Sequence, residues 1–293
     1  MNINEMIDNL PVLEQYELAT KGLFLHELKN DNCGFVRAAV AKQGAFLDEL
    51  KNDNEWQVRA AVAEQGYALD ELKNDTSYGV RKAVAEQGYA LDELKDDPSH
   101  FVRAAVAKQG AFLDELNRNN CNSTVLEAVA SQGHALDKLK NSLSPDVRAA
   151  VAEQGYALDE LKNDHSWEVR RAVAKQGYAL DELKNDSSWE VRYAVAYSGE
   201  FFEELKDDKE WQVRAIVASK GQYLDELKND GNPLVRAVVA RVGAHLDDLK
   251  NDAYQDVRIE VAKQGYALDE LLKDPSPHVQ AVAQSRMLFM NGK

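Results

Sequence analysis

Residues 166–186, SWEVRRAVAKQGYALDELKND, are the clearest copy of a unit that recurs along the whole 293-residue chain. The valine of its Val169-Arg170 pair returns every 22 residues, and the register shifts once, by a single extra residue before Val125. A fixed period of roughly 20–50 residues is typical of repeat proteins, in which each unit packs on its neighbours. The twelve valines are Val36, Val58, Val80, Val102, Val125, Val147, Val169, Val191, Val213, Val235, Val257 and Val279.

With this valine as position 0, each unit is expected to contain two helices. Serine or asparagine is usual at position −3, and proline follows it in three units, which are the preferences of a helix N-cap and first turn. Glycine at +8 would end this first helix, of about ten residues, in a left-handed conformation. Leucines at +11 and +14 indicate a second helix of only a turn or two, partly 3₁₀. The pattern therefore predicts a helix hairpin in each unit.

Residue types around the first helix predict which side is buried. At about 100° per residue, positions 0, +3, +4 and +7 point toward the second helix, whereas −1, +2 and +6 point toward solvent. The first three are nearly always Val, Ala and Val, while −1 and +2 vary. The alanine at +5 and the arginine at +1 fall on the flank that a neighbouring unit would cover. Stacking of units would then bury a continuous core.

Charge and cysteine content limit the partners and the compartment. The formal charge of −15 disfavours direct binding of nucleic acid or an anionic membrane, and it suits a protein partner with a basic or a neutral surface. The chain has two cysteines, Cys33 and Cys121, four repeats apart and thus too distant for a disulfide, which fits a reducing compartment. Neither an N-terminal signal segment nor a long apolar run is present, so a cytoplasmic location is expected.

Aspartate at −5 and arginine at +1 recur together, in the pattern Leu-x-x-Asp-x-x-x-x-Val-Arg-x-x-Ala. This pattern resembles HEAT-type repeats and their short relative, the leucine-rich repeat variant. The resemblance implies a right-handed α-superhelix in which Asp and Arg form a ladder between repeats. In the irregular unit both partners are replaced together, by Asn120 and Leu126, as a charge-assisted contact predicts. Examples of the ladder residues are Asp186, Arg192, Asp208 and Arg214.

The fold class predicted is all-α: a right-handed superhelical solenoid of about twelve 22-residue, two-helix, HEAT-like repeats. Residues 1–35 form an N-terminal cap and partial repeat in this interpretation. Residues 36–278 form the array, with an irregular copy around 117–146, and residues 279–293 form a C-terminal cap. The whole chain is expected to be a single domain.

No residue pattern indicates catalysis, a metal or a cofactor, and the chain is expected to be non-enzymatic. The six histidines occupy different repeat positions, and no nucleotide-binding or nucleophile motif is present. The Asp-Glu pair at +12 and +13 recurs in almost every unit, and such a stripe could imitate a phosphate backbone. Lysines at +15, such as Lys51, Lys73 and Lys162, would partly neutralise it, so a solvated face is the simpler interpretation.

Departures from the repeat gather in the three units between Ser188 and Lys250. Aromatic and arginine side chains, the residue types of interface hot spots, replace Ala, Glu or Gln there. All four tryptophans lie elsewhere in the pattern, at −2, where a ring is expected to cover the groove between repeats. The candidate protein-binding residues are Tyr193, Tyr197, Phe201, Phe202, Tyr223, Arg241 and His245.

These observations favour a repeat scaffold that binds another protein through an extended surface. An alternative is an acidic inhibitor that mimics nucleic acid and occupies the groove of a DNA- or RNA-binding protein, for instance one in host defence. A HEAT-like DNA-modification enzyme is less favoured because the chain lacks a basic groove. The high similarity among copies also leaves open a consensus-engineered repeat protein.

Overall fold

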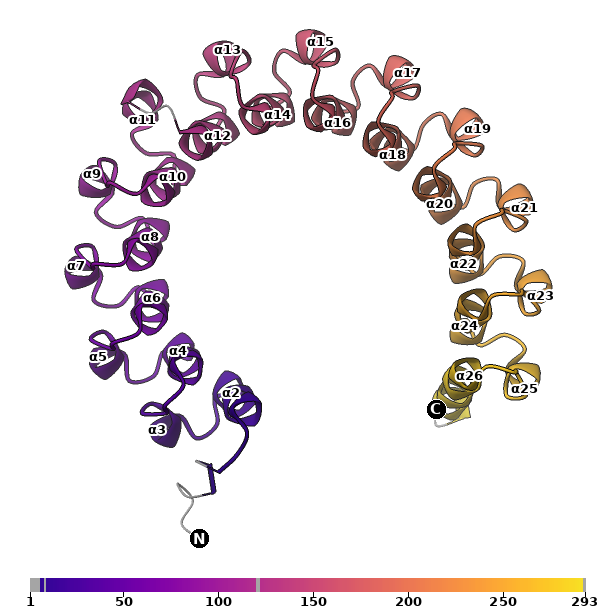
Figure 1. Cartoon of the computed structure of the whole chain (residues 1–293), viewed down its shortest axis with the longest axis horizontal. Coiled ribbons are helices and arrows are strands. Elements are labelled where there is room, and N and C mark those ends of the chain that lie inside the picture. Colours follow the sequence, from indigo (N-terminus) through magenta and orange to yellow (C-terminus); the bar gives the residue numbers. More distant parts are fainter. Residues whose placement is uncertain (1–5, 8, 120–121, 292–293) are drawn as a thin grey trace. The chain divides into compact units, whose positions relative to one another are not determined.

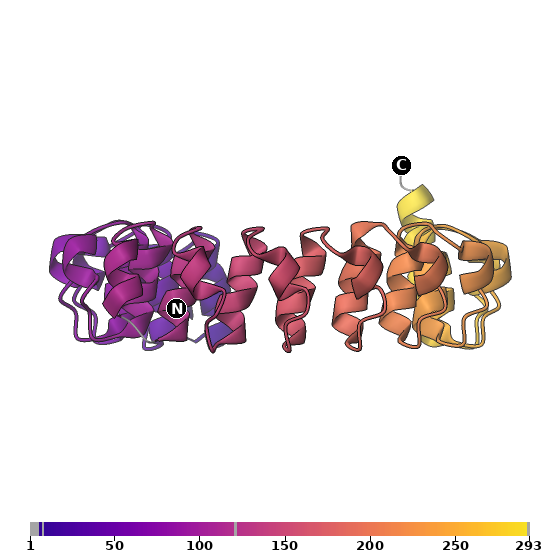
Figure 2. The same ribbon diagram turned by 90° about the horizontal axis from the view of Figure 1, so that it is seen from above.

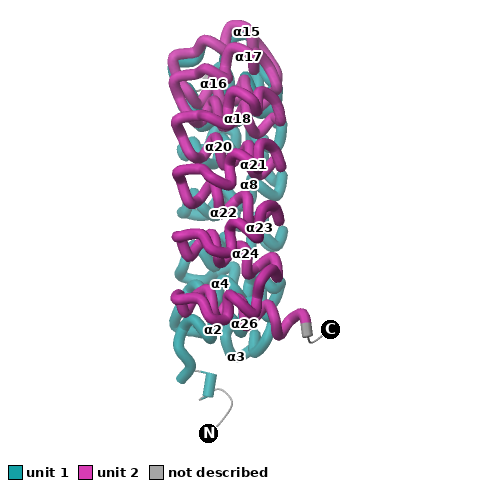
Figure 3. Tube along the Cα trace, turned by 90° about the vertical axis from the view of Figure 1, so that its right-hand side faces the viewer, with its two compact units in different colours: residues 1–154 teal, residues 155–293 magenta. Residues whose placement is uncertain are grey.

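The computed structural model describes residues 6–7, 9–119 and 122–291. Within these residues it contains 25 helices and no strand, and neighbouring helices alternate in length with the 22-residue period. The prediction of an all-α repeat solenoid is therefore confirmed. The contacts divide the chain into two compact units, Met1–Gln154 and Gly155–Lys293 (Figure 3). In each unit one row contains the long helices and a second row the short helices (Figure 1).

Unit 1 begins with α2 (Val12–Thr20) and α3 (Leu25–Leu28), which have the repeat's geometry. Its further long helices are α4 (Gly34–Lys42), α6 (Trp56–Glu64), α8 (Tyr78–Glu86), α10 (His100–Lys108), α12 (Ser123–Ser131) and α14 (Pro145–Glu153). Its short helices are α5 (Leu47–Leu50), α7 (Leu69–Leu72), α9 (Leu91–Leu94), α11 (Leu113–Asn119) and α13 (Leu136–Leu139). In the irregular repeat, Asn120 and Cys121 lie outside the described residues.

Unit 2 has the same alternation. Its long helices are α16 (Trp167–Lys175), α18 (Trp189–Ser198), α20 (Trp211–Ser219), α22 (Pro233–Arg241), α24 (Gln255–Lys263) and α26 (Pro277–Asn291). Its short helices are α15 (Leu158–Leu161), α17 (Leu180–Leu183), α19 (Phe202–Leu205), α21 (Leu224–Leu227), α23 (Leu246–Leu249) and α25 (Leu268–Leu271). Figure 2 shows α26 extending beyond the other long helices of this unit, in keeping with its 15 residues.

The ends of the long helices follow the sequence closely. Residue −3 is the N-cap, as in Ser77, whose hydroxyl accepts a hydrogen bond from the backbone N–H of Gly79. The side chains of Asn122 and Asn232 cap in the same way, whereas several other serines at this position do not. A typical long helix has nine residues and is followed by glycine with a positive φ, such as Gly66 at +73°. These features confirm the predicted helix boundaries to within a residue.

Each short helix starts in a way that the sequence did not indicate. The residue at +10 has left-handed backbone angles, for example Ala179 at φ 52° and Phe201 at φ 56°. Left-handed angles cost a residue with a Cβ about 1 kcal/mol or more, and glycine or asparagine normally occupies such positions. Alanine, phenylalanine, tyrosine and histidine occupy this one. The turn is therefore imposed by the packing of the two helices and not by local preference.

The core contains the valines at position 0, all of which are 0% exposed. The expectation that position +2 faces solvent is wrong for most of the alanines there, such as Ala38 and Ala60, which are 7% and 6% exposed. Long helices of successive repeats pack side by side, as α4 and α6 do, and the next helix covers +2. The expectation that +7 is buried is also wrong. The helix ends before it, and Gln43 at +7 is exposed and donates from Nε2 to the carbonyl oxygen of Thr20 in the preceding repeat.

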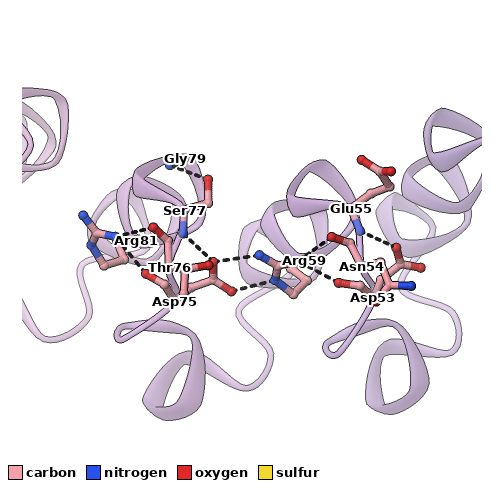
Figure 4. A network of polar contacts seen from close by, with 9 residues as sticks. All are labelled: Asp53, Asn54, Glu55, Arg59, Asp75, Thr76, Ser77, Gly79 and Arg81. Atoms are coloured by element: carbon pink, nitrogen blue, oxygen red, sulfur yellow. Dashed lines mark hydrogen bonds and ion pairs between the residues drawn. The ribbon is translucent and has the colours of Figure 1, made fainter.

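The aspartates and arginines form a ladder between repeats (Figure 4). Arg59 donates from Nε and Nη2 to the two carboxylate oxygens of Asp75 in the next repeat, at 2.6 and 2.9 Å. Its Nη1 donates to the backbone carbonyl of Asp53 in its own repeat at 2.7 Å. Asp75 in turn accepts from the backbone N–H of Ser77 at the start of the following helix. Each rung thus joins two repeats and fixes the loop that begins a long helix.

Candidate functional site

The candidate site is an open hollow of about 450 Å³ on the long-helix row of unit 2. It lies where α16, α18 and α20 pack next to one another, and positions −2, −1, +2, +3 and +6 of these repeats supply its walls. We call it the tyrosine hollow. Its lining residues are Arg171, Lys175, Trp189, Glu190, Tyr193, Ala194, Tyr197 and Gln212.

Two tyrosines from one face of α18 give the tyrosine hollow its apolar surface. Tyr193 is half-buried and packs edge-on against Trp189, with the ring centroids 6.2 Å apart and the planes at 87°. Tyr197 is one turn further along and is 61% exposed. The Nζ atom of Lys220 lies 4.4 Å from the centroid of the Tyr197 ring, within the range of a cation–π contact. Packing thus fixes one ring, while the other remains open to solvent.

Two cations line the same hollow. The guanidinium carbon of Arg171 lies 5.0 Å from the centroid of the Trp167 ring, so that the indole holds the arginine in place. Lys175 is exposed, and in the part of the chain that the structure describes neither cation is within ion-pair distance of a carboxylate. The one acidic side chain in the wall, Glu190, accepts a hydrogen bond from the hydroxyl of Ser188 at 2.5 Å. Among the lining residues the two cations outnumber the one carboxylate, and Glu168 on α16 is a second acidic residue near Arg171.

The same positions in other repeats carry different residues. In α6 they are Ala60 and Glu64, and Glu64 pairs with Lys42 of the preceding repeat at 3.4 Å. In α8 they are Lys82 and Glu86, which pair with each other at 2.7 Å. Cations at +2 or +6 in these repeats thus have a carboxylate partner. Arg171 and Lys175 are different, because position +6 of their own helix is Lys175 where α8 has Glu86, and position +6 of the next repeat is Tyr197 where α6 has Glu64.

Three further residues predicted from the sequence, Phe201, Tyr223 and His245, lie at position +10, before the short helices. The lysine or acid of the preceding repeat contacts each of them. Lys184 Nζ is 4.3 Å from the Phe201 ring centroid and Lys206 Nζ is 4.7 Å from that of Tyr223. His245 Nε2 is 3.2 Å from a carboxylate oxygen of Asp225.

Aromatic residues at +10 are not peculiar to this region, because Phe46 and Phe112 occupy the same position under Lys29 and Lys95. The last two candidates are also separate from the tyrosine hollow. Phe202 takes the place of the +11 leucine at the start of α19 and is half-buried, and Arg241 on α22 donates to Glu260 at 3.2 Å. The structure thus brings together only Tyr193 and Tyr197 of the seven predicted residues. The cations beside them were not singled out, since Arg and Lys are common at variable positions.

Lysine interrupts the acidic stripe in most repeats, whereas in α11 the equivalent residue is Asn117 and His134 of the next repeat lies 3.1 Å from Asp114. Lys162 Nζ lies 3.2 Å from Asp159 of its own repeat and 2.8 Å from Glu182 of the next. The hydrogen bonds that Lys162 donates to Glu182 and Asp159 raise its pKa to about 12. Lys51 and Lys73 bridge two carboxylates in the same manner. The short-helix row therefore has alternating charges and not a continuous row of free carboxylates.

The tryptophans at −2 belong to the packing between repeats. A methyl group added at Gly79 would lie 2.5 Å from the ring of Trp56, which shows that this indole covers the next long helix. Trp167 supports Arg171, and Trp189 supports Tyr193. The indoles at the hollow therefore position the side chains that line it.

In the described residues no group of three or more His, Cys, Asp or Glu side chains is arranged to hold a metal ion. None of the described helices has the length and apolar character needed to cross a membrane. No model of a known protein family matches the chain, and no curated protein matches it either.

Proposed function

We propose that this chain is a non-enzymatic, HEAT-like repeat scaffold of the cytoplasm that binds another protein, and that the tyrosine hollow is the centre of the contact. The observation that carries the proposal is the presence of Tyr193 and Tyr197 beside Arg171, at positions +2 and +6, where most other repeats have alanine and a charged residue. Tyrosine, tryptophan and arginine are the residue types that supply most of the binding energy in protein interfaces. The hollow combines all three on a rigid helical row.

The surrounding architecture supports the same function. The Asp–Arg ladder and the buried valines keep successive long helices in register, so that a partner meets a preformed surface. A preformed surface reduces the ordering cost of association. Nucleic-acid mimicry is less well supported, because lysines such as Lys162 lie between the carboxylates of successive repeats.

Affinity capture with quantified recovery tests this proposal. The double variant Y193A/Y197A is compared with wild type and with the control Y67A/Y89A, which removes two tyrosines of unit 1 that are each 39% exposed. We expect at least one captured protein to be lost about tenfold or more with Y193A/Y197A and to be retained with the control. Retention of every captured protein by Y193A/Y197A would refute the site.

A further inference from the structure

We infer that the tyrosine hollow takes an acidic peptide segment, with an apolar side chain seated against Tyr193 and a neighbouring carboxylate held by Arg171 and Lys175. This inference rests on the proposed protein-binding function and names the chemistry of the partner. The sequence alone suited a partner with a basic or a neutral surface, because the whole chain has a charge of −15. The local arrangement of charges favours an acidic one.

The charges around the tyrosine hollow favour an anionic ligand. The wall of the hollow holds Arg171 and Lys175, and Lys220 adds a third cation where it lies over Tyr197. Two carboxylates oppose them, Glu190 in the wall, which accepts a hydrogen bond from Ser188, and Glu168 beside Arg171, so the cations remain in excess. Arg171 is half-buried and Lys175 is exposed, and neither has an ion-pair partner among the described residues, so an incoming carboxylate gains a charge-assisted contact with each.

The position of Arg171 also favours the binding of a carboxylate. Its guanidinium rests on Trp167, and its Nε is buried without a hydrogen-bond partner among the described residues. A guanidinium already held by an aromatic ring loses little freedom when a carboxylate binds it. Lysine at +2, as in Lys82, is held instead by its own helix through Glu86. The hollow thus has a positioned anion-binding group that the other repeats lack.

The size and lining of the hollow limit the rest of the ligand. A volume of about 450 Å³ accommodates a few side chains and not a folded domain. Trp189, Tyr193 and Ala194 offer ring and methyl surface next to the cations, which suits leucine or an aromatic residue adjacent to Asp or Glu. A segment of alternating acidic and apolar residues meets both requirements.

Selection of displayed random peptides on the intact chain tests the inference. Selections run in parallel on wild type, on Y193A/Y197A and on R171Q/K175Q. The matched control K82Q/K108Q removes the same two charges from positions +2 and +6 of unit 1. Far-ultraviolet circular dichroism and the thermal midpoint confirm that each variant is folded before it is used.

We expect the peptides selected on the wild-type chain to contain Leu, Phe or Trp beside Asp or Glu. Their binding should require both Tyr193 and Tyr197. Synthetic copies should bind R171Q/K175Q about tenfold more weakly, measured by fluorescence anisotropy, and K82Q/K108Q with unchanged affinity. Peptides that require the tyrosines but are basic or uncharged, or that bind R171Q/K175Q normally, would overturn the inference and leave the proposed function intact. The absence of any tyrosine-dependent peptide would overturn both. Enrichment only of phosphorylated synthetic peptides over their Asp and Glu counterparts would overturn the carboxylate assignment.

Discussion

Arg192 binds Asp208 of the next repeat through two parallel hydrogen bonds, from Nε to Oδ2 at 2.6 Å and from Nη2 to Oδ1 at 2.8 Å. A third bond runs from its Nη1 to the backbone carbonyl of Asp186 in its own repeat. The two side chains are only 7% and 5% exposed. Arg192 is on α18, and Asp208 lies in the loop before α20. Their contact therefore fixes the spacing between two of the three long helices that surround the tyrosine hollow.

Removing one partner of this rung should destabilise the protein strongly. R192M leaves the carboxylate of Asp208 buried and unpaired, so we expect a loss of about 3 kcal/mol in the free energy of unfolding. The double variant R192M/D208L should lose less than R192M alone because no buried charge remains. K82M is the matched control at an exposed pair and should change stability by less than about 0.5 kcal/mol. Urea unfolding of the four proteins, followed by circular dichroism, measures these differences; equal losses for R192M and K82M would contradict the ladder's role.

The ladder also predicts a loss of stability in acid. Burial alone raises the pKa of Asp186, but hydrogen bonds from Arg170 and from the backbone N–H of Ser188 outweigh it and hold this pKa below its ordinary value. The carboxylates of Asp230 and Asp252 have pKa values lowered by the same combination. A folded-state pKa below the unfolded value contributes stability that is present above the unfolded pKa, about 3.9, and is lost as the pH falls through the folded pKa.

We therefore expect the urea midpoint to be nearly constant from neutral pH to about pH 5 and to fall steeply below about pH 4. In the variant R170M/D186L the urea midpoint should fall less steeply with decreasing pH, because one carboxylate with a lowered pKa has been removed. An unchanged slope would mean that this rung does not contribute to the pH dependence.

The left-handed residue at +10 gives a prediction about backbone strain. At Ala179, glycine should be tolerated at least as well as alanine, whereas valine should cost about 1–2 kcal/mol because a β-branched side chain resists this conformation. Phenylalanine controls for size, since Phe201 already occupies the equivalent position. Thermal and urea unfolding should rank A179V below A179F. The reverse order would show that size and not backbone conformation limits the position.

Glu260 is a departure from the repeat whose removal should do little harm. It occupies position +3, where most repeats have alanine, and is 8% exposed. Arg241 and Lys263 hold its carboxylate, the former at 3.2 Å and the latter at 2.9 Å. Both cations are more than half exposed, so E260A leaves them solvated. We expect E260A to be neutral or to stabilise by up to about 1 kcal/mol, and a loss above 2 kcal/mol in urea unfolding would contradict this account.

Much of the fold could be predicted from the sequence because the repeat averages out local ambiguity. The N-cap position, the left-handed glycine and the four-residue second helix all follow from residue types that act within one unit. Two features depend on packing and not on local residue preference, and both were missed. The burial of Ala38 arises from the next long helix, and the left-handed backbone of Ala179 arises from packing, with no glycine or asparagine to indicate it.

The candidate site could be predicted only in part for the same reason. Tyr193 and Tyr197 are recognisable as departures from the repeat, and both lie on one face of α18. Phe201 and Tyr223 are aromatic too, but their position is also aromatic in other repeats, as at Phe46, and the preceding lysines cover their rings. Arg171 gave no signal in the sequence. Its importance comes from the lack of a carboxylate at the positions that pair such cations elsewhere.

Site-specific photocrosslinking tests the central claim most directly. A photoreactive phenylalanine derivative replaces Tyr197 in one protein and Tyr89 of unit 1 in the control, and both are irradiated in the same extract. We predict a covalent adduct with a partner protein at position 197 that disappears when Y193A is added, with no such adduct at position 89. Equal adducts at both positions, or adducts at position 197 that persist with Y193A, would contradict the assignment of the tyrosine hollow as the binding site.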